Sequence, residues 1–353
     1  MAENKELVVT GIPSAKVKAI AERVALEFQL AADKVAAHHA EPGKYPLPSD
    51  AKSTEQILTR RFRTLPEAQQ KQAADRISVE LRGGAARTKR LGDLAKVDLK
   101  SSSGIDEQVR KTPLPARMKF PVDELQRMSD ALVGPMTTAT QETAAAAFPE
   151  LRNLELRIHR VKCVDETSEI GKDEIDLGGT SVDEDGDTKK ISAFRVRSFS
   201  TGTVQTYSPP RRFTHFSLTE QSKVTFPKTY FVTLVVAEVD WGGLADFLNE
   251  LLDKVKAKVA AALAAAIGGA IGSPGGPLGI AIGVAVGFVV GLVFDYLKGL
   301  WGDEVFKPIT VSATISSLTS RFPGGQDNST DRTLDFKGHG GHYQLTYDWR
   351  KYN

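Results

Sequence analysis

The 353-residue sequence contains one cysteine, Cys163, so no disulfide can form within the chain. A fold without disulfides does not depend on an oxidising compartment. An excess of charge of one sign is also lacking, because 46 basic and 44 acidic residues leave a formal net charge of +2. This nearly neutral net charge indicates neither nucleic acid nor a membrane surface as a partner. The hydrophobic fraction of 41% and the charged fraction of 25% are those of a soluble globular protein.

The motifs of the common enzyme classes are missing. There is no G-x-S-x-G nucleophile elbow, no H-E-x-x-H zinc motif, no phosphate-binding loop and no dinucleotide fingerprint. Cys163 has no histidine at a recognisable spacing, and the basic stretch 82–90 has no interleaved aromatic residues. We therefore expect neither an enzyme nor a nucleic-acid-binding protein.

The first residues, MAENKELVVTGIPSAK, show no basic region followed by an apolar core. Such a pattern would mark a secretory signal peptide. We expect a soluble form made in the cytoplasm. Any export would use a dedicated system, with the protein acting at a target membrane.

Two apolar arms, residues 259–272 and 278–294, flank the helix-breaking sequence SPGGP at 273–277. They correspond to roughly 21 and 25 Å of helix at about 1.5 Å per residue. A bilayer core is about 30 Å thick, so both arms are short for a constitutive span. The sequence predicts a soluble protein with a helical hairpin that is either insertable into lipid or tightly buried.

Glycines recur every fourth residue along the second arm, which places them on one face of a helix. Glycine inside a helix costs roughly 0.5–1 kcal/mol relative to alanine, and small residues at this spacing allow two helices to pack closely in lipid. We therefore predict a glycine-zipper hairpin. The predicted membrane-inserting residues are Gly279, Gly283, Gly287, Gly291, Phe288 and Phe294. Lys254, Lys256 and Lys258 precede the first arm and are predicted to contact lipid headgroups.

The secondary-structure pattern changes along the chain. Residues 1–150 have helical periodicity, with a linker near 100–117, and residues 151–353 have alternating strand character interrupted by the hairpin at 243–302. The predicted fold class is α+β. A helical region is followed by an antiparallel β-sandwich into which the glycine-rich hairpin is inserted.

Carboxylates follow two of the predicted strands. Asp165 and Asp173 lie after the first strand, and Glu238, Asp240 and Asp246 lie after the run YFVTLVVAEV. Calcium takes six to eight oxygen ligands, and sandwich folds gather their loops at one end. These five residues are candidate calcium ligands. The alternative interpretation is that they are solvated loop charges.

The run LVVAEVDWGGLADFL at 234–248 resembles the strand and acidic loop of C2 domains, and HGGHYQLTYDW at 339–349 resembles their final strand. The resemblance covers residues 153–240 and 305–353. It implies an eight-stranded sandwich that attaches to anionic lipid through calcium at one tip. The sequence departs from the family in having Glu238 in place of aspartate and about 60 residues inserted in the third loop.

Histidines give weaker signals. His339 and His342 in GHGGH fit a glycine-rich turn before the last strand, and His159 and His215 fit strand packing.

The combined pattern predicts a membrane-active protein, pore-forming or toxin-like, that associates on the membrane as several copies. The alternative is a non-enzymatic structural or cargo protein whose hairpin stays buried. In either case we expect the N-terminal helices to cover the hairpin.

Overall fold

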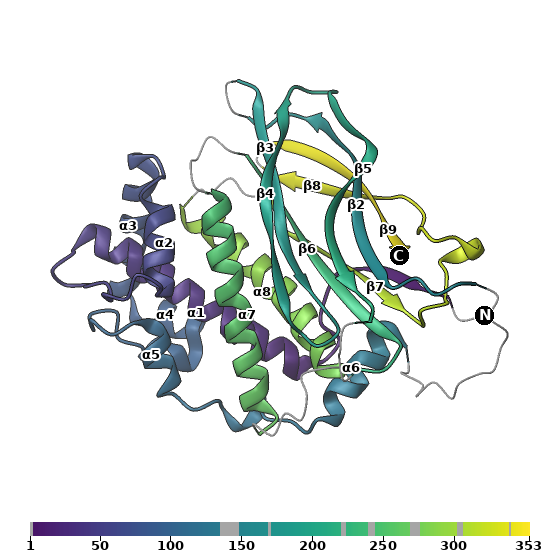
Figure 1. Cartoon of the computed structure of the whole chain (residues 1–353). Coiled ribbons are helices and arrows are strands. Elements are labelled where there is room, and N and C mark those ends of the chain that lie inside the picture. The colour runs from purple at the N-terminus through teal and green to yellow at the C-terminus, as the bar shows by residue number, and fades with distance from the viewer. Residues whose placement is uncertain are drawn as a thin grey trace.

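The computed structural model describes residues 3–134, 148–168, 171–219, 224–238, 244–268, 276–301, 306–338 and 340–353. Helices occupy one side of the molecule and two stacked antiparallel sheets occupy the other (Figure 1). The fold class is therefore α+β, as predicted, and the two sheets are compatible with a sandwich.

The N-terminal helices begin and end where the sequence provides caps. Ser14 and Ser53 accept hydrogen bonds from backbone N–H groups in the first turns of two helices, and Gly83 ends a third. These helices are α1 (Ala15–Ala40), α2 (Thr54–Phe62), α3 (Glu67–Arg82), α4 (Gly84–Leu91), α5 (Ile105–Arg110) and α6 (Asp123–Val133), with 3₁₀ turns at Gly92–Lys96 and Ala116–Met118.

Two sequence-based expectations in this region need amendment. The segment 100–117, predicted to be a linker, contains α5, because Glu55 accepts the N–H of Ile105 at 2.6 Å and fixes the start of the helix. Helical periodicity was expected up to residue 150, but in its last part the structure describes only α6, and residues 135–147 lie outside the described ranges.

Nine described strands form the two sheets. The five-stranded sheet has the order β1-β7-β6-β3-β4 and the four-stranded sheet the order β5-β2-β9-β8. The strands are β1 (Lys5–Val9), β2 (Asn153–Asp165), β3 (Asp173–Val182), β4 (Thr188–Phe199), β5 (Val204–Ser217), β6 (Lys228–Glu238), β7 (Ile309–Ile315), β8 (Arg332–Gly338) and β9 (Gly341–Tyr352). A 3₁₀ turn occupies Pro323–Gly325.

The two sheets enclose one apolar core. Tyr230, Val232, Leu234 and Val236 of β6 face this core, while Trp349 of β9 joins it from the other sheet. Phe231, Val235 and Ala237 of β6 instead pack with the helices. Both faces of β6 are therefore buried, which explains its nearly continuous apolar sequence.

Two features of the sheets were not predicted. β1 belongs to the region expected to be helical, yet it pairs with β7 at the edge of the five-stranded sheet. The sequence PPRRF at 209–213, whose paired prolines are typical of a turn, lies within β5. Proline is tolerated there because β5 is an edge strand of its sheet.

Helices α7 (Leu244–Ala266) and α8 (Pro277–Trp301) form a middle layer between the N-terminal helices and the five-stranded sheet (Figure 1). α7 packs against β3 and β4, and α8 packs against β3, β6 and β7. On the opposite side α1 contacts both α7 and α8. The four-stranded sheet lies on the far side of the sandwich from this helical layer (Figure 1).

Candidate functional site

Helix α8 is the most apolar of the described helices. It has 25 residues, about 37 Å of helix, and its most apolar window has a mean hydropathy of 2.4. No charged residue occurs between Pro277 and Phe294. Among the described helices it alone is long and apolar enough to cross a bilayer. In this structure 78% of that window is buried inside the protein.

The glycine face of α8 rests on the five-stranded sheet. A Cβ added to Gly283 would lie 2.3 Å from Cδ2 of Phe231 in β6, and one added to Gly287 would lie 2.0 Å from Oγ1 of Thr310 in β7. Distances this short are essentially never seen for a real Cβ. The absence of side chains thus lets the backbone of α8 approach the sheet directly.

The two ends of the glycine stripe differ. A Cβ on Gly279 would lie 2.5 Å from the carbonyl oxygen of Glu184, in the turn between β3 and β4, whereas one on Gly291 would meet only Cε of Lys307 at 3.9 Å. The stripe was predicted to serve close packing between helices. In this structure its first three glycines serve close packing between a helix and a sheet.

Charged groups join α7 to the N-terminal helices. Nζ of Lys258 lies 2.8 Å from Oε2 of Glu27 in α1 and 2.5 Å from Oδ1 of Asp106 in α5. The side chain of Lys258 is only 12% exposed, so its predicted contact with headgroups would require this ion pair to open. Nζ of Lys256 lies 3.5 Å from the carbonyl oxygen of Thr188, and Lys254 is half-buried.

A second polar group joins α8 to α1. Asp33 accepts a hydrogen bond from the hydroxyl of Tyr296 and pairs with Arg90 at 2.6 Å. Burial raises the pKa of Asp33, and the neighbouring Arg90 opposes that rise only in part. A carboxyl group with a raised pKa takes up its proton more readily in the folded state, so acid does not weaken the fold through Asp33.

The predicted calcium ligands are only partly brought together. Asp173 and Glu238 are both buried, and both approach Oγ1 of Thr167, at 2.9 and 3.0 Å. Asp165 is exposed and does not complete a group of three ligands with them. The side-chain position of Asp246, within α7, and all of Asp240 lie outside the described residues.

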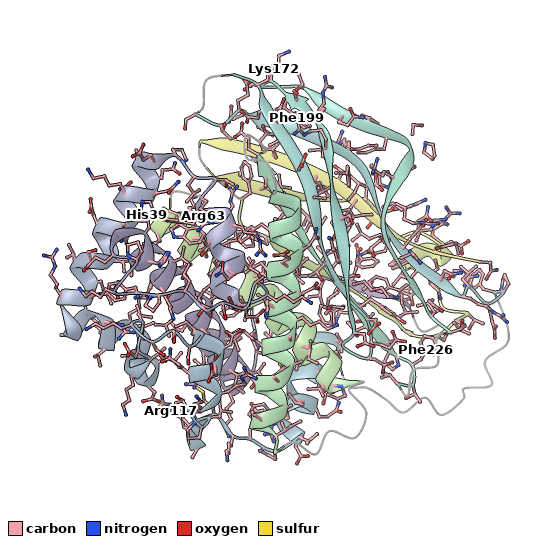
Figure 2. The ribbon with its side chains drawn as sticks, turned by 60° about the vertical axis from the view of Figure 1, so that its left-hand side comes forward. His39, Arg63, Arg117, Lys172, Phe199 and Phe226 are labelled. Carbon is pink, nitrogen blue, oxygen red and sulfur yellow. The ribbon has the colours of Figure 1, made fainter. Side chains whose placement is uncertain are left out.

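Protein donors already occupy the oxygens of Asp173. The N–H of Thr167 donates to Oδ2 at 2.7 Å, and the hydroxyl of Tyr343 donates to the same oxygen. This end of the sandwich is marked by Lys172 and Phe199 in Figure 2, at the start of β3 and the end of β4. Asp173 is buried at this end and bonds to Thr167 and Tyr343. It does not face a solvent-filled cluster of loops.

One group of metal-ligating side chains was not predicted. Within the described ranges, the group of three or more such ligands that lies together is His159, Asp331 and Asp348, whose ligand atoms are within 4.8 Å of one another. They come from β2, from the loop before β8 and from β9. No sequence motif could identify them, because the pairing of β2 with β9 and the path of the loop before β8 bring them together. His159 had been assigned to strand packing.

Comparison of the chain with family models, with curated proteins and with solved structures found no match. The resemblance of residues 153–240 and 305–353 to C2 domains therefore stays a prediction.

Proposed function

We propose that this chain is a membrane-active protein that stores α7 and α8 inside a soluble form and inserts them into a lipid bilayer. The observation that carries the proposal is the composition of α8. Eighteen or more residues of low charge are the usual requirement for a span, and α8 meets it over a single helix of 25 residues.

The contacts around α8 support storage in a form that can open. Its glycine face contributes no side chains of its own to the contact with the sheet, and its opposite side is covered by α1, a helix from a distant part of the sequence. Once released, the same smooth face could pack against a neighbouring helix in lipid. Several copies would then associate on the membrane, in a pore-forming or toxin-like assembly.

The second candidate is a non-enzymatic structural or cargo protein in which α8 remains a core helix. The close approach of Gly283 to Phe231 and of Gly287 to Thr310 favours it. This packing accounts for glycine at these two positions without a membrane. The two candidates differ in a single respect, which is whether α8 ever leaves the sheet.

The test requires a substitution that opposes insertion and leaves the soluble fold intact. Leucine at Gly283 would fail this requirement, because it would collide with Phe231. Phe288 is better placed, because it lines a groove of about 120 Å³ where a lysine could reach solvent. A lysine near the middle of a span opposes insertion by about 2.5–3.5 kcal/mol. Val79→Lys on α3 is the matched control, since Val79 is 63% exposed.

Dye release from anionic liposomes would be measured for the wild type, Phe288→Lys and Val79→Lys, each with calcium and with EDTA. We expect leakage from the wild type and from Val79→Lys, and little leakage from Phe288→Lys. Equal leakage from all three proteins would show that α8 does not insert. A wild type that neither binds nor permeabilises the liposomes would favour the second candidate. Leakage that is the same in EDTA would remove calcium from the proposal.

A further inference from the structure

His159 lies at an irregularity in the centre of the four-stranded sheet. Ile158 pairs with Tyr347 of β9 and Arg160 pairs with Thr346, so His159 is the extra residue of a bulge. The pairing with β5 is also shifted between Ile158 and Arg160. Bulges re-aim a side chain at the expense of regular pairing and are common beside functional sites.

The bulge brings the imidazole of His159 to two carboxylates. Its Nε2 atom lies 3.0 Å from Oδ1 of Asp348 and 3.6 Å from Oδ1 of Asp331. A cation bound at about 2.1 Å to two ligands, with bond angles between square and tetrahedral, separates those ligands by about 3.0–3.4 Å. The observed separations are close to this range.

The direction of the contact between Nε2 of His159 and Oδ1 of Asp348 is also relevant to whether a cation lies between them. Nε2 of His159 is buried and has no hydrogen-bond partner among the described residues, although Oδ1 of Asp348 lies within hydrogen-bond distance. The carboxylate oxygen is therefore displaced from the axis along which the ring nitrogen would donate or accept. A cation shared by both atoms lies on that axis and leaves the oxygen beside it. The arrangement suits a bridging ion better than a direct hydrogen bond.

The net charge of the groups around His159 is compatible with a bound divalent cation. Arg157 donates from Nε to Oδ1 of Asp348 at 2.9 Å and from its terminal nitrogen to Oδ2. A carboxylate oxygen has a second lone pair, so Oδ1 can accept this bond and also bind a metal. Two aspartates and one arginine give a net negative charge around the imidazole. Asp331 is 58% exposed, so water can complete the coordination shell.

We propose that His159, Asp331 and Asp348 form a binding site for a divalent transition-metal ion, with Zn²⁺ the preferred occupant. Imidazole nitrogen together with carboxylate oxygen is a ligand set that zinc accepts, whereas calcium takes oxygen alone. The site lies on the outer face of the four-stranded sheet, away from α8. It is independent of the proposed membrane activity and of the predicted calcium ligands.

The chain contains a matched control on the same face. Nε2 of His342 lies 2.6 Å from Oδ1 of Asp335, but the described residues offer this histidine no group of three ligands. Zinc binding to the full chain would be measured by calorimetry for the wild type, His159→Gln, Asp331→Asn and His342→Gln. Visible absorption of Co²⁺ would report the coordination of the ion. Circular dichroism would confirm that each variant is folded.

We expect one zinc ion per wild-type chain and a Co²⁺ spectrum of low coordination number. His159→Gln and Asp331→Asn should each weaken zinc binding by about tenfold or more, because each removes a direct ligand. His342→Gln should bind zinc like the wild type. Absence of binding at about 100 µM Zn²⁺, well above the range of structural zinc sites, would overturn the site. Equal losses in His159→Gln and His342→Gln would also overturn it, because the ion would then bind surface histidines in general.

Discussion

The ring of Phe231 in β6 lies directly against the backbone of Gly283 in α8, with no space for even one methyl group between them. Phe231 is 2% exposed and is held between the sheet and the helical layer, so it has little freedom to move aside. The distance between α8 and the sheet is therefore set by a glycine.

Alanine at Gly283 should destabilise the protein. The new Cβ would lie 2.3 Å from Cδ2 of Phe231, and overpacking of this kind typically costs about 1–3 kcal/mol. Gly291→Ala is the control, since only Cε of Lys307 lies near its Cβ position, at 3.9 Å. There the better helix propensity of alanine should stabilise the fold by about 0.5–1 kcal/mol. Urea unfolding would measure both. Equal effects at the two positions would contradict the packing described for Gly283.

Asp183→Asn should stabilise the protein at pH 8 and have little effect at pH 4. Burial raises the pKa of Asp183 to about 6, although its Oδ1 accepts the N–H groups of Asp185 and Asp187. A raised carboxyl pKa means that the fold binds this proton more tightly than the unfolded chain does. Its stabilising contribution is therefore complete at low pH and is lost as the pH rises through about 4 to 6.

Asparagine keeps the acceptor oxygen of Asp183 and carries no charge. At pH 8 we expect a gain of roughly 1–2 kcal/mol, because the full shift corresponds to about 3 kcal/mol and partial exposure reduces it. Chemical denaturation at the two pH values measures the difference. A loss of stability at pH 8 would mean that the charge itself holds the turn between β3 and β4.

Lys258→Met should destabilise the protein strongly. The substitution leaves Glu27 and Asp106 facing each other without the ammonium group that lies 2.8 and 2.5 Å from them. Breaking a buried pair by removing one partner costs about 3–5 kcal/mol. Adding Glu27→Gln and Asp106→Asn to this variant should restore part of the loss. Thermal unfolding of the single and triple variants would show whether it does. An equally unstable triple variant would assign the effect to packing of the lysine stem instead.

Much of the fold could be predicted because periodicity is a local signal. Helical periodicity marks the N-terminal region, and the alternation in β2 and the apolar run in β6 mark strands. The strand β1 could not be predicted in this way. Five residues among helical segments give little periodicity, and the pairing that makes them a strand is with β7.

The candidate sites were harder to predict, because they depend on which elements meet. Glycines four residues apart specify a smooth helix face but not its neighbour, and here that neighbour is a sheet. Asp173 and Glu238 lie close to the same hydroxyl group, yet nothing local shows that both would turn toward Thr167. The bulge at His159 arises from the pairing of three strands and has no signature in the sequence of any one of them.

Deleting residues 1–10 should destabilise the whole sheet and not only the N-terminus. The deletion removes β1, exposes the edge of β7 and removes Asn4, whose Oδ1 accepts bonds from the N–H of Ser316 and the hydroxyl of Ser320. An exposed edge strand also promotes association between chains. We expect a lower melting temperature and soluble aggregates in size-exclusion chromatography. A monomer with unchanged melting temperature would show that β1 is dispensable.

The pairing of β1 with β7 also constrains the order in which a ribosome can complete this fold. Lys5 pairs with Thr314, and the whole of α8 is synthesised between them. When α8 is synthesised, β7 and its Thr310 are still to be translated, so the part of the sheet that receives Gly287 does not yet exist. Helices α1–α6 are already available at that moment. Strand β6, which carries Phe231, also precedes α8 in the chain, so Gly283 can meet β6 first, and β7 closes over Gly287 only afterwards.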